Sequence, residues 1–172
     1  VERKVVRVVT PGTLTDSDLL PEKAERPLLA VCTVPNRKQV TTGLAWLSLA
    51  SGALKLMEFT ADSKTAALRL VQELERIAPA EVLRADANGA DMFEETSIGH
   101  NQRVPEWHFE VVHGHKALLD QLGVSTLSGF GADGLGAAFG AAGALLRYAQ
   151  STQGRGLQHV KSLAVEIGRA HV

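Results

Sequence analysis

The fold of this chain rests on one stretch, LLAVCTVPNRKQVTTGLAWLSLASGALKLMEF (Leu28–Phe59). It opens with Leu28–Val34, an apolar run of the length that is typical of a buried strand. Two more candidate strands follow, Thr41–Leu49 and Ala53–Phe59, and Ala50–Gly52 between them predicts a tight hairpin. Consecutive strands joined by short turns indicate an antiparallel meander.

Helices and further strands follow the meander. Asp62 and Ser63 precede a predicted helix over Lys64–Ala78, where apolar residues recur at helical spacing and Pro79 ends the pattern. The residues from Asp86 to Val104 show the weakest patterning in the chain. The remaining predicted elements are strands Glu81–Leu83 and Trp107–Val112 and helices His115–Leu122 and Leu135–Ser151. This order predicts an α/β domain with a mixed sheet flanked by helices, and a ribonuclease H-like fold begins with the same order.

Composition limits the class of protein. The chain has 172 residues, 45% hydrophobic and 22% charged, which is typical of one soluble domain with attachments. A net charge of -1 argues against a surface that coats nucleic acid. A single cysteine, Cys32, excludes an internal disulfide, and no apolar run is long enough to span a membrane. We therefore expect a cytoplasmic protein without a membrane anchor.

Two functional alternatives arise from the residues, a nucleotide-binding domain from a glycine-rich pattern and a nuclease from the order of the strands. GFGADG, Gly129–Gly134, matches the glycine pattern of a dinucleotide-binding loop, but neither a strand before it nor an acidic residue about 20 positions later supports that interpretation. A degenerate ribonuclease H-like nuclease would need carboxylates on the central strands. Ser48 stands where an acid would be wanted, and we expect Glu58 and Asp86 to be solvated. Both alternatives stay open at this point.

Other reactive residue types predict no chemistry. His108, His113 and His115 cluster in sequence, but Gly114 should break regular geometry there, so we expect surface histidines and no metal site. Cys32 lies in an apolar strand and is expected to be an inert buried thiol. No nucleophile triad, Walker loop or metalloprotease pattern is present, so we expect no enzyme activity, catalytic residue or cofactor-binding residue in this chain.

A family resemblance accounts for the remaining patterns. Four stretches carry it: VERKVVRVVTPGTLTDSDLL (1–20), WLSLASGALKL (46–56), LSGFGADGLGAAFGAAGALLRYAQSTQ (127–153) and LQHVKSLAVE (157–166). In order and in spacing they resemble the MutS family of bacterial DNA mismatch repair proteins. At Ser48 this chain departs from the Asp that the family commonly carries.

The resemblance implies a division of the chain. Residues 1–13 would be the last strand of a mismatch-recognition domain, without its sheet partners, and residues 14–27 a linker. Residues 28–153 would be the ribonuclease H-like connector domain, and residues 154–166 the start of the core (lever) domain. Residues 167–172, IGRAHV, depart from the family and resemble a translated sequencing adapter, so we expect a non-native tail.

The resemblance also implies a function. Full-length family members bind mismatched DNA as homodimers, use ATP with magnesium and recruit MutL, but their mismatch-reading and ATPase motifs lie outside this chain. What remains is a connector that links those parts and docks MutL. On the helix over His115–Leu122, a step of about 100° per residue turns the leucines inward and Lys116, Ala117, Asp120 and Gln121 outward. The resemblance implies MutL contact at these four residues, although the family is more often polar at Ala117.

Overall fold

The structure is a computed structural model that describes residues 26–86, 98–153 and 157–167. In chain order its elements are β1 (Leu28–Asn36), β2 (Gln39–Leu47), β3 (Leu54–Asp62), α1 (Ser63–Ile77), β4 (Glu81–Asp86), β5 (His100–Pro105), the 3-10 helix η2 (Glu106–Phe109), α2 (Val111–Leu122), the 3-10 helix η3 (Ser128–Phe130), α3 (Ala137–Gln153) and β6 (Leu163–Val165). The predicted terminal strand at 1–13, residues 14–25 of the linker and residues 168–172 of the tail lie outside the described residues.

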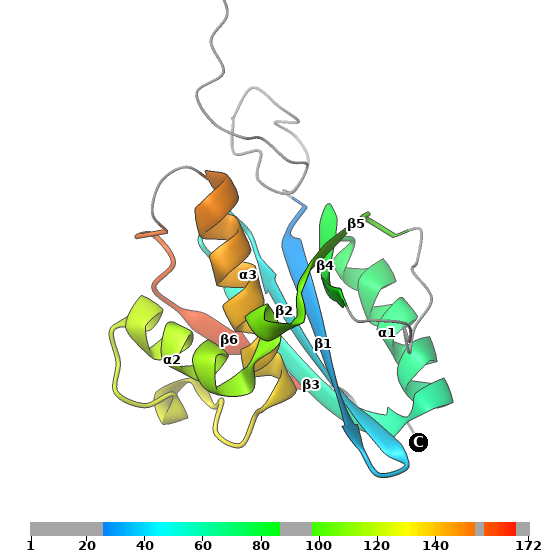
Figure 1. The fold of residues 1–172 in the computed structure, drawn as a ribbon. Helices are drawn as coiled ribbons and strands as arrows, with labels where there is room; N and C mark the ends of the chain where they lie inside the picture. Colours follow the sequence, from blue (N-terminus) through cyan, green and yellow to red (C-terminus); the bar gives the residue numbers. More distant parts are fainter. Residues whose placement is uncertain (1–25, 87–97, 154–156, 168–172) are drawn as a thin grey trace, which may run out of the picture.

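The strands form one mixed sheet in the order β5-β4-β1-β2-β3-β6 (Figure 1). β1, β2 and β3 pair antiparallel, which confirms the predicted meander. β4 runs parallel to β1, β5 parallel to β4, and β6 parallel to β3. The α/β class with a mixed sheet is therefore confirmed.

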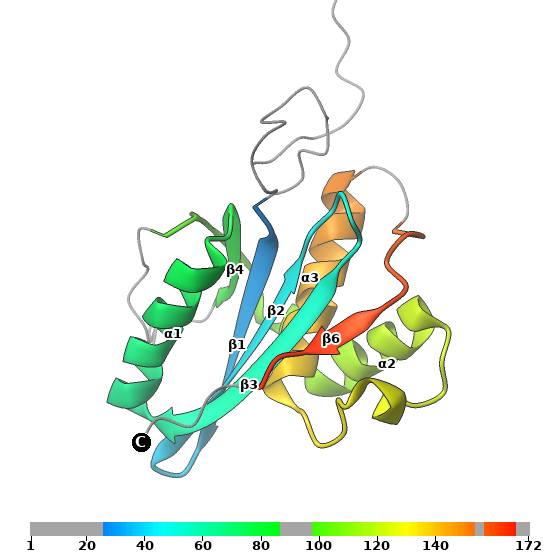
Figure 2. The ribbon, with the colours of Figure 1, turned by 180° about the vertical axis from the view of Figure 1, so that it is seen from behind.

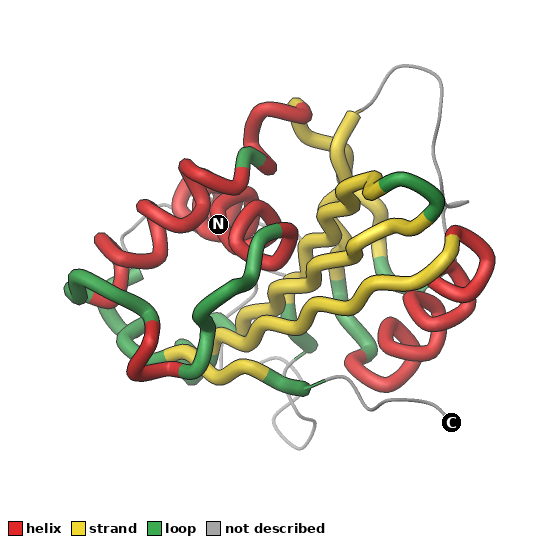
Figure 3. The backbone as a smooth tube through the Cα atoms, turned by 90° about the horizontal axis from the view of Figure 1, so that it is seen from below, coloured by secondary structure: helices red, strands yellow, loops and turns green. Residues whose placement is uncertain are grey.

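Helices cover both faces of the sheet. Seen from below, the strands separate α1 from α2 and α3 (Figure 3). Successive side chains of a strand point to opposite faces, so β1 buries Leu29 against α1 and Ala30 on the side of α3. Leu70 of α1 and Leu145 of α3 are fully buried in these two clusters. Burial of each such leucine contributes roughly 1.5 to 3 kcal/mol to folding.

The local signals around α1 and the second hairpin are confirmed. The Asp62 carboxylate accepts a hydrogen bond of 2.9 Å from the Thr65 amide, and this N-cap lowers the pKa of Asp62. Gly52 in the hairpin between β2 and β3 has φ +76°, a conformation that favours glycine. A Cβ on Gly52 would also lie only 2.5 Å from the carbonyl oxygen of His159.

The strand predicted over Trp107–Val112 was wrong, and the strand β5 before it was not predicted. Trp107–Val112 is not a strand, because η2 occupies its first part and α2 begins at Val111 instead of His115. The edge strand β5 overlaps the end of the stretch with the weakest patterning. Its HNQRVP sequence lacks alternation because the strand pairs with β4 alone and buries only Val104.

Gly114 lies inside α2, so our expectation that it would break regular geometry was wrong. A Cβ on Gly114 would overlap the carbonyl oxygen of Phe139 in α3. On the other helix, a Cβ on Gly143 would lie 2.7 Å from the Cα of Gly114. The missing side chains let the two helices touch through their backbones, and this contact outweighs the low helix propensity of glycine.

The folded body continues beyond residue 153. Leu157 and Val160 are buried in the cluster beneath α2 and α3, and β6 lies along β3 (Figure 2). The Glu166 amide donates a hydrogen bond of 2.8 Å to the Leu56 carbonyl. The described part of the expected core-domain start, residues 157–166, therefore packs on this sheet, while its assignment to a separate domain stays a prediction.

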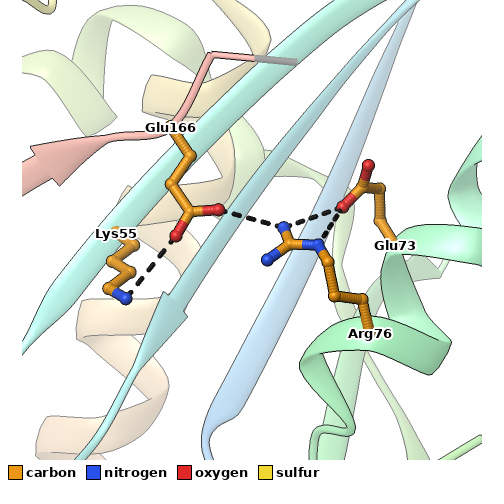
Figure 4. Close-up of polar contacts among 4 residues, drawn as sticks. All are labelled: Lys55, Glu73, Arg76 and Glu166. Carbon is orange, nitrogen blue, oxygen red and sulfur yellow. Dashed lines mark hydrogen bonds and ion pairs between the residues drawn. The ribbon is translucent and has the colours of Figure 1, made fainter. Parts of the chain in front are cut away.

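An ion-pair network, which we call the Glu166 network, holds the end of this segment (Figure 4). One oxygen of the Glu166 carboxylate lies 3.0 Å from Nη2 of Arg76, and the other lies 3.5 Å from Nζ of Lys55. Arg76 also donates from Nε to Glu73 at 2.8 Å, and its guanidinium carbon lies 5.9 Å from the ring centre of Trp46. Arg76 therefore forms ion pairs with two carboxylates and contacts one aromatic ring.

Candidate partner-binding surface

The helix α2 carries the predicted partner-binding residues. Lys116 and Asp120 are exposed, while Leu118 and Leu122 are buried against the rest of the fold, as the helix geometry predicted. Leu119 is half-buried. The exposed arc of α2 therefore presents one cation and one anion.

The outward orientation predicted for Ala117 and Gln121 was wrong. Ala117 is half-buried and packs against the core. Gln121 is half-buried too, and its Nε2 donates hydrogen bonds to the carbonyl oxygens of Leu157 at 2.8 Å and Val160 at 3.0 Å. The chain returns beside α2 after α3, and the side-chain amide of Gln121 donates to two backbone carbonyls of that segment, one of which, that of Leu157, also accepts from the Val160 amide at 3.0 Å. Gln121 therefore holds the segment that leads to β6.

A groove of about 380 Å³ lies beside this arc, between η2, α2 and α3. We call it the α2–α3 groove. It is lined by Trp107, His108, His113, Ala117, Asp120, Gln121, Gly143, Leu146, Arg147 and Gln150. Three of the four predicted partner-binding residues thus line the groove, and Lys116 does not.

Trp107 and Arg147 form a stacked pair in the groove. The guanidinium carbon of Arg147 lies 4.8 Å from the ring centre of Trp107, and the Trp107 side chain is 52% exposed. A cation over an indole ring is a favourable contact of about 0.5 to 1 kcal/mol at an exposed site. Within the described ranges, no carboxylate forms an ion pair with Arg147. Its hydrogen-bonding edge is thus open to a partner.

His108 completes the cluster as a neutral side chain. Its ring packs edge-on to Trp107 at a centroid distance of 4.2 Å. Burial, and then the charge of Arg147, lower the pKa of His108 below its ordinary value. The Nδ1 atom is buried without a hydrogen-bond partner among the described residues. His108 is therefore a half-buried side chain in the wall of the groove, and the cation beside it is Arg147.

The sequence reasoning missed this pair for an identifiable reason. The sequence predicts a strand at Trp107, and a strand gives no sign that this aromatic ring is exposed beside two helices. Arg147 did carry a signal, because it is the only charged residue between Ala137 and Gln153. An isolated arginine in an apolar helix is a candidate for a specific contact.

The glycine-rich pattern at Gly129–Gly134 leads to a helix start that is already occupied. One oxygen of Glu58 on β3 accepts hydrogen bonds of 2.9 Å from both the Gly136 and the Ala138 amides at the start of α3. Our expectation that Glu58 is solvated was wrong, because a carboxylate is stabilised at the positive end of a helix. A phosphate at this position would have to displace an internal carboxylate.

The remaining candidates for chemistry are dispersed. Asp86 is exposed, as expected, and His113 is exposed beside Glu110. Among the described residues, no group of three or more His, Cys, Asp or Glu side chains is arranged to hold a metal ion. Cys32 is buried, as predicted, and burial together with the charge of Glu58 raises its pKa to about 12. Such a thiol is inert at neutral pH.

One comparison with known proteins bears on this surface. The family model described as MutS domain II matches residues 28–161. The match begins at the first residue of β1 and runs through the meander and all three α-helices. It therefore contains every residue of the α2–α3 groove.

Proposed function

The chain belongs to the MutS family of DNA mismatch repair proteins through domain II, the connector, and on this premise we propose that it docks a MutL-type partner on the exposed arc of α2. The observation that supports the proposal is the placement of Lys116 and Asp120 beside a groove that holds an exposed Trp107 and Arg147, which forms no ion pair with any described residue. Tryptophan and arginine are enriched among residues that dominate protein interfaces.

The proposal includes the finer fold class. The order β3-β2-β1-β4-β5, with β4 and β5 parallel to β1, supports a ribonuclease H-like sheet to which β6 is added beyond β3. The proposal assigns no catalysis to this chain and places the protein in the cytoplasm. Binding of mismatched DNA, ATP with magnesium and homodimer formation are assigned to other domains of the full-length family protein. Within the described residues, no helix is long and apolar enough to cross a membrane.

A charge swap on α2 tests the docking proposal. Lys116→Glu combined with Asp120→Lys, placed at the matching positions of a full-length family member, keeps the net charge and reverses the local pattern. We expect the affinity for MutL to fall about tenfold, equal to about 1.4 kcal/mol, with mismatch binding unchanged. Gln121 stays intact in this variant, because it holds the segment before β6.

A matched swap elsewhere provides the control. Lys64→Glu combined with Asp86→Lys changes two exposed residues outside α2 and the groove. It should leave MutL affinity within about twofold of the parent, since rim charges that touch no partner contribute little. An unchanged affinity in the Lys116 and Asp120 variant would exclude the arc of α2 as the docking site.

A further inference from the structure

Among the described residues, two arginines lie over tryptophan rings. Arg76 over Trp46 is completed by the carboxylates of Glu73 and Glu166, at 2.8 Å and 3.0 Å. The planar guanidinium offers several N–H donors at its edge while its face lies on an aromatic ring. The Glu166 network thus shows how this fold completes such a pair.

Arg147 also lies over a tryptophan ring, that of Trp107, but no described carboxylate completes this pair. Its guanidinium carbon lies closer to the ring centre, at 4.8 Å against 5.9 Å for Arg76. Among the residues that the structure describes, no acidic side chain pairs with it, and Asp120 on the facing helix forms no ion pair either. The edge of the guanidinium that would bind a carboxylate is therefore unoccupied.

We infer that the α2–α3 groove binds a segment of the docking partner that carries one carboxylate, with Arg147 as the residue that binds it. The identity of that partner rests on the proposed function. The carboxylate forms charge-assisted hydrogen bonds with the Arg147 edge, and a neighbouring apolar side chain of the segment packs on the exposed ring of Trp107.

The other lining groups restrict the segment to a single acidic residue. Asp120 lies in the groove and repels a second carboxylate. His108 is neutral, because burial and Arg147 lower its pKa, so it adds no second cation. A volume of about 380 Å³ accommodates a few side chains, which fits a short extended segment. We therefore expect an acidic residue flanked by apolar residues.

Two synthetic peptides test this inference on the chain itself. The probes are acetyl-Leu-Asp-Leu-amide and its twin acetyl-Leu-Asn-Leu-amide, which differ in one charge. Binding is followed by NMR through the Trp107 indole and Arg147 Nε signals. We expect the Asp peptide to bind at least tenfold more tightly than the Asn peptide, and this preference to disappear in Arg147→Gln.

Arg76→Gln is the matched control, because that arginine already carries its carboxylates. It should keep the tenfold preference. Equal binding of the two peptides, or a preference that survives Arg147→Gln, would overturn the inference.

A second measurement separates this inference from the proposed function. Arg147→Gln in a full-length family member should reduce MutL affinity about as much as the Lys116 and Asp120 swap does. If both variants recruit MutL normally while the peptide preference holds, the docking proposal fails and the carboxylate site stands. If the peptide preference is absent while the swap weakens recruitment, docking stands and the carboxylate site fails.

Discussion

Each face of the sheet carries an arginine over a tryptophan ring, but the two pairs differ in exposure and in their ion pairs. On the α1 face, Trp46 is only 7% exposed and Arg76 above it joins Glu73 and Glu166. On the α2–α3 face, Trp107 is 52% exposed and Arg147 has no carboxylate among the described residues. An arginine with internal partners contributes to the fold, whereas one without them is available for binding.

The packing beneath the two pairs also differs. On the α1 face, amphipathic α1 lays Leu70 and Leu74 on the sheet through ordinary side-chain contacts. On the other face, Gly114 and Gly143 bring α2 and α3 into backbone contact, and the groove opens beside that contact. The open site therefore stands beside a close backbone contact between two helices.

The largest expected effect is on the rate at which the Cys32 thiol, buried on the α2–α3 face, reacts with an alkylating reagent. Burial raises the pKa of Cys32 from 9.0 to about 12, so its thiolate is rarer by about a thousandfold at pH 8. Iodoacetamide should label Cys32 in the folded chain at least a thousandfold more slowly than in the chain unfolded in urea. Labelling at the unfolded rate would show that the α2–α3 face opens readily.

The same shift makes stability depend on pH. A thiol whose pKa is higher in the folded than in the unfolded chain contributes stability that is complete below pH 9.0. We expect the free energy of unfolding to decrease as the pH rises from 9.0 towards 12. Cys32→Ala should remove this part of the pH dependence.

Gly114→Ala tests the backbone contact between α2 and α3. The added methyl would overlap the Phe139 carbonyl, and such overpacking costs about 3 kcal/mol, of which the better helix propensity of alanine returns about 1 kcal/mol. Urea denaturation should therefore show a net loss of about 2 kcal/mol. In Gly136→Ala the new Cβ meets no atom within 4 Å, so its stability should change by less than about 0.5 kcal/mol.

The smallest expected effect belongs to the Glu166 network. Its side chains are partly exposed, so Glu166→Gln should lower stability by only about 0.5 kcal/mol at low salt. In 1 M NaCl the difference should disappear, because screening weakens exposed ion pairs. Asp120→Asn, which breaks no ion pair among the described residues, should have no such salt-dependent effect. A loss above about 2 kcal/mol that persists in high salt would mean that the network is a buried structural element.

The fold was predictable where its signals are local. Leu28–Val34 was recognised as a strand from its apolar run, the second hairpin from Gly52, and α1 from its cap at Asp62. β5 was missed because an edge strand carries little alternation. Trp107–Val112 was misassigned because its alternating bulk is equally compatible with a 3-10 turn followed by a helix.

The candidate site was predictable only in part. Helix periodicity placed Lys116 and Asp120 on the exposed arc, since exposure along a single helix follows from its 100° step. It failed for Gln121, whose side chain pairs with carbonyls 36 and 39 residues further along the chain. No local rule reports a contact over that separation.

The sequence by itself determined the α/β class, the meander, the cap of α1 and the family, because each depends on local sequence patterns and on their order along the chain. Only the tertiary structure decided which polar groups are paired within the fold and which stay accessible to a partner. Glu58 accepts hydrogen bonds at the start of α3, and Arg76 forms ion pairs with Glu73 and Glu166. Arg147 stays open because the packing of α2, α3 and η2 places an aromatic ring beside it, and no described carboxylate within ion-pair distance.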